Sequence, residues 1–298
     1  MSGRSSGWAA SSALLLPAAA FFLAFALGPM AAAVYISFLD WDGVSAPRWI
    51  GLGNWAHAFT DSLTLRSLFL TAQVMILSWA IQTPVSLLLG VFLAGYQRYR
   101  AVLGAFYFLP LLFSAVAIGL IWSSSMLSAD GALNTFLRSV GLGFAAQDWL
   151  GDPDLALYAV IAVIAWQFIP FHTLLYQAGA RQIPRVLYEA ARIDGAGTLQ
   201  QFFYITLPQL KYTVVTSTVL ILTGSLTYFD VIYVMTGGGP GFATRVLPLH
   251  MYITAFQNAQ IGYGSAIAVI LAVAGVALSL FLLRVTGFGR MESQAEGL

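Results

Sequence analysis

The sequence predicts an all-α integral membrane protein with six transmembrane helices. Of its 298 residues, 59% are hydrophobic and only 8% are charged, whereas a soluble domain carries roughly a quarter charged residues. Six apolar runs, each with at most one charged residue, are long enough to cross a bilayer core about 30 Å thick. The runs lie at approximately 12–38, 67–95, 101–126, 156–179, 212–236 and 263–283. We therefore expect one transmembrane domain over residues 1–298.

Composition excludes several other classes of protein. Six such runs with so few charges elsewhere do not fit the buried helices of a soluble core. The net charge of +1 gives no electrostatic reason to expect a nucleic acid as partner, and the absence of cysteine excludes disulfides and thiolate chemistry. The first run resembles the apolar part of a secretory signal, but its length favours a retained helix.

The distribution of basic residues predicts the orientation in the membrane. Short loops rich in arginine and lysine stay in the cytoplasm. With the N-terminus inside, nine basic residues fall in inner segments and four in outer ones. The inner nine are Arg4, Arg98, Arg100, Arg181, Arg185, Arg192, Lys211, Arg284 and Arg290, and the outer four are Arg48, Arg66, Arg138 and Arg245. Both termini are therefore predicted to be cytoplasmic.

Catalytic motifs are missing from the sequence. No Gly-x-x-x-x-Gly-Lys-[Ser/Thr] segment is present, so any ATP must be hydrolysed by another polypeptide. The three histidines, His57, His172 and His250, show no metal-ligand spacing. We predict that this chain is not itself an enzyme and that it binds no metal and no cofactor.

The predicted inner loop 180–211 is much longer than a simple turn requires. Pro184 suits the first turn of a short helix, and Gly195 suits its end, where the backbone adopts positive φ. Thr198 can cap a second short helix that Pro208 stops. Ala190 and Ala191 share one face of the first helix with Leu187 and Asp194, and small residues there permit close approach of another surface. Glu189 alternatively pairs with Arg185 or Arg192 on a solvated face.

One spaced motif in this loop carries a family resemblance. Glu189-Ala190-Ala191 is followed by Gly195 after three residues and, nine residues later, by Ile205-Thr206-Leu207-Pro208. This pattern resembles the EAA loop of permease subunits in binding-protein-dependent ABC importers. Other segments extend the resemblance, over nearly the whole chain, to sugar permeases of the maltose and glycerol-phosphate type. They are 51–55 (GLGNW), 108–110 (FLP), 183–184 (IP), 194–196 (DGA), 228–233 (YFDVIY) and 236–240 (TGGGP).

The resemblance implies a division of labour between subunits. The loop would form a cytoplasmic coupling helix, between the fourth and fifth spans, that sits in a cleft of an ATPase subunit. The implied coupling residues are Glu189, Ala190, Ala191, Asp194, Gly195, Leu207 and Pro208. The implied partners are a second related permease, two ATPase subunits that carry ATP and magnesium, and an extracytoplasmic solute-binding protein. The implied location is the inner or plasma membrane of a bacterium, in contact with membrane lipid.

Polar residues in the fourth and fifth runs suggest where a solute binds. Polar side chains inside a bilayer usually face an interior or a cavity, and amide and hydroxyl groups beside aromatic rings suit an uncharged polyol such as a sugar. Aligned on the maltose-type permease, the sugar-contacting positions fall at Gln167, Phe168, Phe171, Ser225 and Tyr228. Ordinary helix packing is the alternative for each residue. Two alternatives for the chain are an ion-gradient-driven transporter and an ABC permease for a non-sugar solute, and the principal site can lie on the partner permease.

Overall fold

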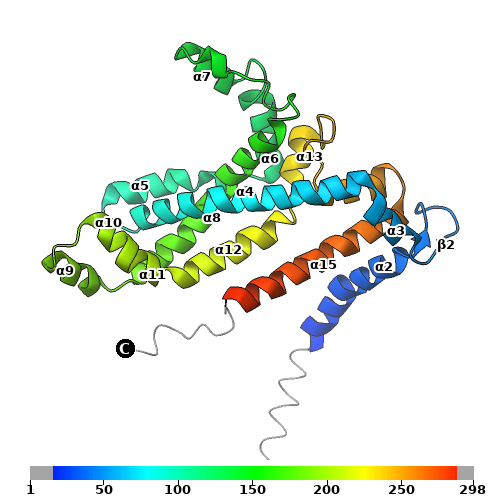
Figure 1. Ribbon diagram of the computed structural model, residues 1–298, viewed down its shortest axis with the longest axis horizontal. Helices are drawn as coiled ribbons and strands as arrows, with labels where there is room; N and C mark the ends of the chain where they lie inside the picture. Colours follow the sequence, from blue (N-terminus) through cyan, green and yellow to red (C-terminus); the bar gives the residue numbers. More distant parts are fainter. Residues whose placement is uncertain (1–15, 287–298) are drawn as a thin grey trace, which may run out of the picture. The chain divides into compact units, whose positions relative to one another are not determined.

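The computed structural model describes residues 16–286 and is mostly helical (Figure 1). Four helices are long and apolar enough to cross a membrane: Leu16–Ile36, α4 (Ser62–Leu93), α8 (Ala156–Gln182) and α15 (Ile261–Thr286). The first includes η1 (Leu23–Leu27) and α2 (Gly28–Ile36). Two bent helix pairs raise the count to six if each pair is one span. The start of the predicted first run, both termini, Arg4 and Arg290 lie outside the described residues.

The predicted third span, 101–126, is not one continuous helix. α5 (Arg98–Tyr107) and η2 (Leu109–Leu112) meet α6 (Ala115–Leu120) and η3 (Ile121–Met126) at an angle of 95°. Pro110 lies in the first turn of η2 and cannot donate a backbone hydrogen bond. Ser114 then starts a new helix, because its side chain accepts a hydrogen bond from the Ala117 N–H at 3.2 Å. The predicted third span is therefore bent, and it counts as one span only if the two parts are taken together.

The predicted fifth span, 212–236, is also divided. α12 (Lys211–Ser225) ends before a four-residue break, 226–229, and α13 (Asp230–Thr236) follows. Phe229, with φ −123° and ψ −55°, lies outside helical geometry directly before Asp230. The Thr227 hydroxyl donates to the Gly224 carbonyl at 2.8 Å and so satisfies one acceptor at the end of α12. Hydrophobicity continues across this break, which is why the sequence alone suggested a single helix.

The inner loop contains α9 (Arg185–Ile193), α10 (Thr198–Gln201), η5 (Phe202–Thr206) and α11 (Leu207–Gln209). The residues 198–209 meet α12 at an angle of 67°. The second helix ends at Gln209, one residue beyond Pro208, and the Leu207 N–H bonds the Phe202 carbonyl, five residues back, in a wider turn before the proline. Gly197, rather than Thr198, is the N-cap, and its N–H donates to Gln200 Oε1 at 2.8 Å.

Backbone contacts divide the chain into two compact units. The described part of unit 1 covers 16–66 and 250–273, and that of unit 2 covers 67–249 and 274–286. Unit 1 contains α3 (Gly53–Thr60), η6 (Ile253–Gln257) and the antiparallel strands β1 (Leu39–Asp40) and β2 (Arg48–Trp49). α14 (Leu247–Tyr252) spans the division. A Cβ at Gly262 would overlap the Leu39 carbonyl oxygen, so glycine permits the close approach of α15 to β1.

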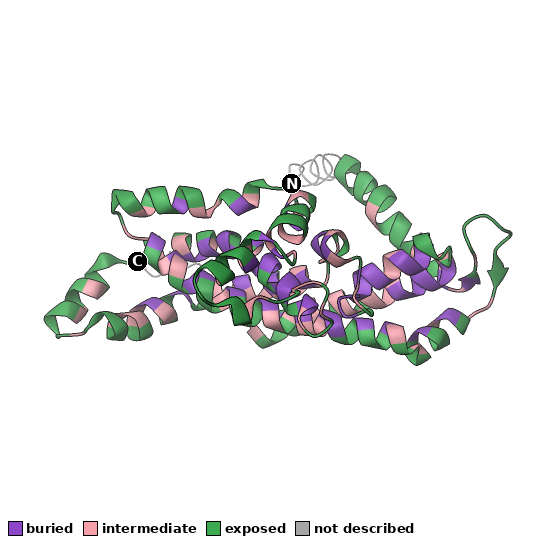
Figure 2. Ribbon diagram, turned by 90° about the horizontal axis from the view of Figure 1, so that it is seen from above, coloured by how far each residue is buried: buried purple, intermediate pink, exposed green. Residues whose placement is uncertain are grey.

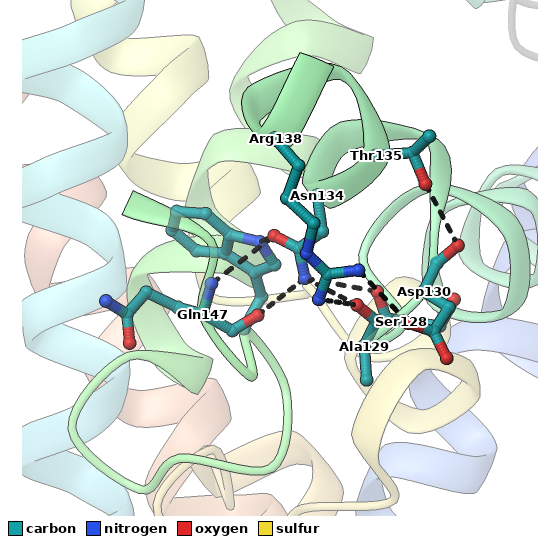
Figure 3. A network of polar contacts seen from close by, with 8 residues as sticks. Ser128, Ala129, Asp130, Asn134, Thr135, Arg138 and Gln147 are labelled. Carbon is teal, nitrogen blue, oxygen red and sulfur yellow. Dashed lines mark hydrogen bonds and ion pairs between the residues drawn. The ribbon is translucent and has the colours of Figure 1, made fainter. Parts of the chain in front are cut away.

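In unit 2, α8 is the most buried of the long helices. It packs closely on α4, where a Cβ at Gly90 would lie 2.5 Å from the Tyr176 Cβ. The α7 segment (Ala132–Ser139) and η4 (Gly143–Ala145) project from α6 and η3 (Figure 1). Asn134 joins this outer lobe: its Nδ2 donates to the Gln147 carbonyl at 2.8 Å, and Trp149 Nε1 donates to its Oδ1 at 2.8 Å (Figure 3).

Large apolar surfaces stay uncovered in the described chain. In the most apolar window of Leu16–Ile36 no residue is buried, and in that of α15 17% are buried. Figure 2 shows the N-terminal helix, beside the grey trace marked N, exposed along most of its length. A helix satisfies its own backbone polar groups, so such surfaces can be covered by lipid tails.

Candidate functional site

A cavity of about 420 Å³ lies in unit 2. Its wall comes from α8, α12, the 226–229 break, the start of α13, η2 and the start of α6. The lining residues are Leu111, Ala115, Phe168, Phe171, His172, Leu220, Gly224, Thr227, Tyr228, Phe229, Asp230 and Val231. Residues at both breaks in the predicted spans therefore line this cavity. At each break a helix ends beside the cavity, so that non-helical backbone or side chains face it.

Aromatic rings dominate the cavity wall. Phe168 on α8 and Tyr228 in the break are stacked, with ring centroids 5.3 Å apart and planes at 27°. Phe171 meets the ring of His172 edge-on at 5.1 Å. His172 is buried, and its Nδ1 lies 3.0 Å from Ser217 Oγ on α12. The His172–Ser217 hydrogen bond therefore ties the two helices that carry most of the cavity.

The five predicted solute residues separate into two groups. Phe168, Phe171 and Tyr228 line the cavity, whereas Gln167 and Ser225 do not. Gln167 is 7% exposed and its Oε1 lacks a hydrogen-bond partner. The Ser225 hydroxyl donates to the Ile221 carbonyl of its own helix at 2.7 Å. The structure thus brings three of the five together, and the role of each residue in solute binding stays a prediction.

Sequence reasoning missed the contribution of the third run and the burial of Gln82. Leu111 and Ala115 lie on either side of the break in the third run and line the cavity, whereas Gln82, in the middle of α4, does not line it. The Gln82 side chain is fully buried, and neither its Nε2 nor its Oε1 has a hydrogen-bond partner among the described residues. A glutamine in the middle of a long apolar run was a usable signal, because a buried polar group is costly unless it gains a partner. Leu111 and Ala115 carried no comparable signal.

The inner loop forms a second candidate site, an exposed hook attached to a buried base. Glu189, Ala190, Asp194, Gly195 and Pro208 are exposed, and Ala191 and Leu207 are half-buried. Gly195 has φ +80°, in the left-handed region that favours glycine. Its predicted position in the turn after the first helix agrees with the structure, since α9 ends at Ile193. Among the described residues Glu189 forms no ion pair with Arg185 or Arg192.

The base of the hook belongs to the core of unit 2. Leu87, Tyr176, Ile183 and Leu210 form a buried cluster, and Tyr188, Phe202, Ile205 and Leu207 of the loop pack against it. Tyr188 and Thr206 share a hydrogen bond of 2.9 Å between their side-chain oxygens, which joins α9 to η5. The loop is thereby fixed to α4, α8 and α12 and not merely tethered by its ends.

Fold and sites together define a polytopic membrane transport subunit. The profile of the family described as the binding-protein-dependent transport system inner membrane component matches residues 86–286. The chain is also 35% identical over 282 residues to the probable ABC transporter permease protein YurN of Bacillus subtilis, covering 94% of this chain and 97% of that protein. It belongs to this family, and it is the permease subunit of an ABC importer. The resemblance found in the EAA motif is confirmed.

Other relatives and a solved structure agree. Identity is 31% over 278 residues to the trehalose/maltose transport system permease protein MalF of Thermococcus litoralis, covering 93% of each chain. It is 33% over 292 residues to the diacetylchitobiose uptake system permease protein NgcF of Streptomyces coelicolor, covering 92% and 82%. A crystal structure of a bacterial ABC transporter that imports the acidic polysaccharide alginate superposes with a TM-score of 0.80 at 25% identity, covering 92% and 94%.

Proposed function

We propose that this permease translocates a neutral sugar or related polyol through the cavity in unit 2. The observation that carries the proposal is the stacked pair Phe168–Tyr228 in the cavity wall. The apolar face of a sugar ring packs well on aromatic rings, and Thr227, Tyr228 and His172 offer polar atoms for its hydroxyls. The relatives named for trehalose, maltose and diacetylchitobiose support the same class of solute.

The charges in the cavity favour a neutral solute over an acidic one. Among the described residues that line it, Asp230 is the one charged side chain, and no arginine or lysine is present. A carboxylated sugar would meet the Asp230 carboxylate without a cation to compensate its own charge, and burial of an unpaired charge is costly. The solute is therefore expected to differ in charge from that of the alginate importer.

The exposed hook supports the proposed coupling function of α9. A separate ATPase subunit, which carries ATP and Mg²⁺, would receive α9 in a surface cleft. Glu189 and Asp194 are free of ion pairs with described residues, and Ile193 is 87% exposed. Charged and apolar groups left uncovered on one short helix suit a protein interface. Ala190 and Ala191 let the partner backbone approach, while Gly195 supplies the bend.

The remaining assembly follows from the family and from what the chain lacks. A second permease, two ATPases and an extracytoplasmic binding protein would complete the importer in a bacterial inner membrane, with both termini cytoplasmic. A solved relative of 24% identity is a bacterial alginate ABC transporter in complex with a pentasaccharide-bound periplasmic protein. The absence of a phosphate-binding Gly-Lys-[Ser/Thr] motif supports a separate ATPase.

Uptake into proteoliposomes tests the proposal. The chain is co-purified with the products of its neighbouring transport genes, reconstituted, and offered a panel of neutral and uronate oligosaccharides loaded on the binding protein. We expect a neutral sugar to accumulate in the proteoliposomes. This accumulation should require ATP on the side of the membrane that corresponds to the cytoplasm. Uptake driven by an ion gradient without ATP, or uptake of uronates alone, would contradict the proposal. Phe168→Ala, with the exposed Phe144→Ala of the outer lobe as matched control, assigns the effect to the cavity.

A further inference from the structure

A second cavity, of about 200 Å³, lies in unit 1, apart from the proposed solute pathway and the hook. Asp40 and Trp41 reach it from β1 and the residue that follows, Asn54 from α3, and Tyr263 from the first turn of α15. The other lining residues are Asp42, His57, Ala259 and Gln260. The predicted orientation places these residues on the outer side of the membrane. The cavity therefore faces whatever approaches the importer from outside the cell.

Hydrogen-bond acceptors without a donor are concentrated in this cavity. Both amide hydrogens of Asn54 are used, by the Ser37 carbonyl at 3.0 Å and the Leu39 carbonyl at 2.8 Å. Its Oδ1 accepts no hydrogen bond from a described residue and is not closed off from solvent, although the residue as a whole is only 9% exposed. Asp42 Oδ1 accepts from the Val44 and Ser45 N–H groups, which leaves Oδ2 free. Asp42 is exposed, and its Oδ2 and the Asn54 Oδ1 can both accept a hydrogen bond from a ligand that enters the cavity.

Two donors on the cavity wall are occupied, whereas the His57 and Gln260 side chains form no hydrogen bond with described residues. Trp41 Nε1 donates to the Ser45 carbonyl at 2.9 Å, and the Tyr263 hydroxyl donates to Asp61 Oδ2 at 3.0 Å. Asp40 pairs with Arg48 at 2.7 Å, so Asp42 contributes the uncompensated charge. Hydrogen bonds from Val44 and Ser45 lower the pKa of Asp42 to about 2, which keeps it ionised at every physiological pH. The cavity thus attracts a cation that donates several hydrogen bonds.

Aromatic rings give the cavity flat walls. Trp41 and Tyr263 line it, and the ring of His57 lies 4.5 Å from the ring of Tyr263. A guanidinium group is planar, donates five hydrogen bonds, sheds water more easily than an ammonium group and stacks on aromatic faces. Acceptors and rings in one cavity therefore suit guanidinium better than a lysine ammonium.

The backbone around the cavity is strained at one residue and is fixed by hydrogen bonds. Ala259, on its wall, has φ +52°, which is unfavourable for a residue with a Cβ. The neighbouring Gln260 N–H bonds the Thr254 carbonyl at 3.0 Å, and the Gly262 N–H bonds the Trp41 carbonyl at 3.0 Å. Such strain persists where surrounding contacts fix it, often at ligand sites.

We propose that the unit 1 cavity binds a guanidinium group, as presented by an arginine side chain of the extracytoplasmic binding protein. That the ligand is a guanidinium group is inferred from the cavity alone. That the binding protein supplies it is an inference that rests on the proposed function. Docking would place the arginine between Asp42 and Asn54 and against the Trp41 ring. The cavity would then be a recognition point for the loaded binding protein and not a solute site.

Binding of methylguanidinium to the full-length protein in detergent tests this proposal. Tryptophans are replaced by 5-fluorotryptophan, and the Trp41 fluorine resonance is assigned by its loss in Trp41→Phe. A saturable shift of that resonance is expected with methylguanidinium and not with methylurea, which has a similar shape and no charge. Asp42→Asn should weaken binding by at least about tenfold, the equivalent of one lost charge-assisted hydrogen bond, while its remaining oxygen preserves the turn.

Two further variants keep the test decisive. Asp152→Asn is the matched control, because Asp152 Oδ1 also accepts a backbone N–H, that of Asp154 at 2.8 Å, and Asp152 belongs to unit 2 and does not line the cavity. It should leave the affinity unchanged. If Asp42→Asn elutes as an aggregate, Asp40→Asn is used in its place, because asparagine retains an acceptor for Arg48. Asp40→Asn should also weaken the binding of methylguanidinium.

Three results would overturn the guanidinium site: equal shifts with methylurea, affinity insensitive to both aspartate variants, or a saturable response to glucose and none to methylguanidinium. The assay involves neither ATP nor transport. A protein that imports sugar but ignores methylguanidinium would lose only this inference, and one that binds methylguanidinium but imports nothing would lose only the proposed function.

Discussion

Substitution of Gly195 tests whether the bend after α9 transmits force from an ATPase. Gly195 has φ +80°, and a Cβ built there would meet no atom within 4 Å. Any loss caused by a side chain must therefore come from backbone conformation and not from a clash. The left-handed region costs an ordinary residue about 1–2 kcal/mol, a β-branched residue more, and asparagine less.

These costs predict an ordered series. A penalty of 1–2 kcal/mol lowers the population of the bent loop by a factor of about 5 to 30. Solute uptake per ATP hydrolysed should therefore fall in the order Gly195, Gly195→Asn, Gly195→Ala, Gly195→Val. ATP hydrolysis stimulated by loaded binding protein is measured alongside uptake in the same proteoliposomes.

Gly141 provides the matched control. It has φ +81° and no atom within 4 Å of a built Cβ, and it lies in the outer lobe. Gly141→Val should cost similar folding stability without altering uptake per ATP. Equal coupling in Gly195→Val and the unmodified protein would refute the reasoning, as would equal loss of coupling in both valine variants.

Three other perturbations follow from the same structure. Glu189→Lys should leave the protein in the membrane but abolish solute-stimulated ATPase activity, because it reverses the exposed charge of the hook; normal stimulation would count against α9 docking. Phe168→Ala removes the stack on Tyr228, and a loss of about 0.5–1.5 kcal/mol should raise the KM for sugar roughly twofold to tenfold; an unchanged KM in titrated uptake would place the solute elsewhere. Partial burial opposes ionisation of Asp61, but hydrogen bonds from Thr64, Leu63 and Tyr263 lower its pKa from 3.8 to about 2. The stability that ionised Asp61 gives the folded protein should thus be complete above about pH 4 and decline as pH falls towards 2. The thermal unfolding temperature of Asp61→Asn should therefore fall less between pH 4 and pH 2 than that of the unmodified protein. A parallel acid dependence would exclude this role.

Hydropathy predicted where apolar helices lie but not where they break. Pro84 and Pro170 sit inside continuous helices, α4 and α8, whereas Pro110 accompanies a 95° bend. The difference lies in the residues that follow, since Ser114 caps a new helix after Pro110. Proline alone removes one donor, and neighbouring helices decide whether the chain continues. Predicting the third and fifth spans required information about packing that a local pattern lacks.

The spaced motif predicted the hook better than the composition predicted the cavity. A turn such as that at Gly195 depends on backbone φ, which glycine signals locally. A cavity depends on which helix faces meet, and Phe168 meets Tyr228 from 60 residues away in the sequence. Gln167, adjacent to Phe168, points elsewhere because neighbouring helical residues are about 100° apart. Residue types therefore predicted which segments line the cavity, but they could not predict which face of each helix points into it.

A single buried cluster connects the hook with both principal walls of the cavity. Tyr176 and Leu210 belong to this cluster and lie on α8 and at the start of α12, whose other parts hold Phe171 and Gly224 in the cavity wall. A Cβ at Gly179 would lie 2.8 Å from Leu210, so the two helices are in tight contact at this end. At 1.5 Å per residue, Gly179 lies about 12 Å along α8 from Phe171. The packing at this end therefore joins the hook to both walls of the cavity, whereas the non-helical residues 226–229 separate α13 from α12.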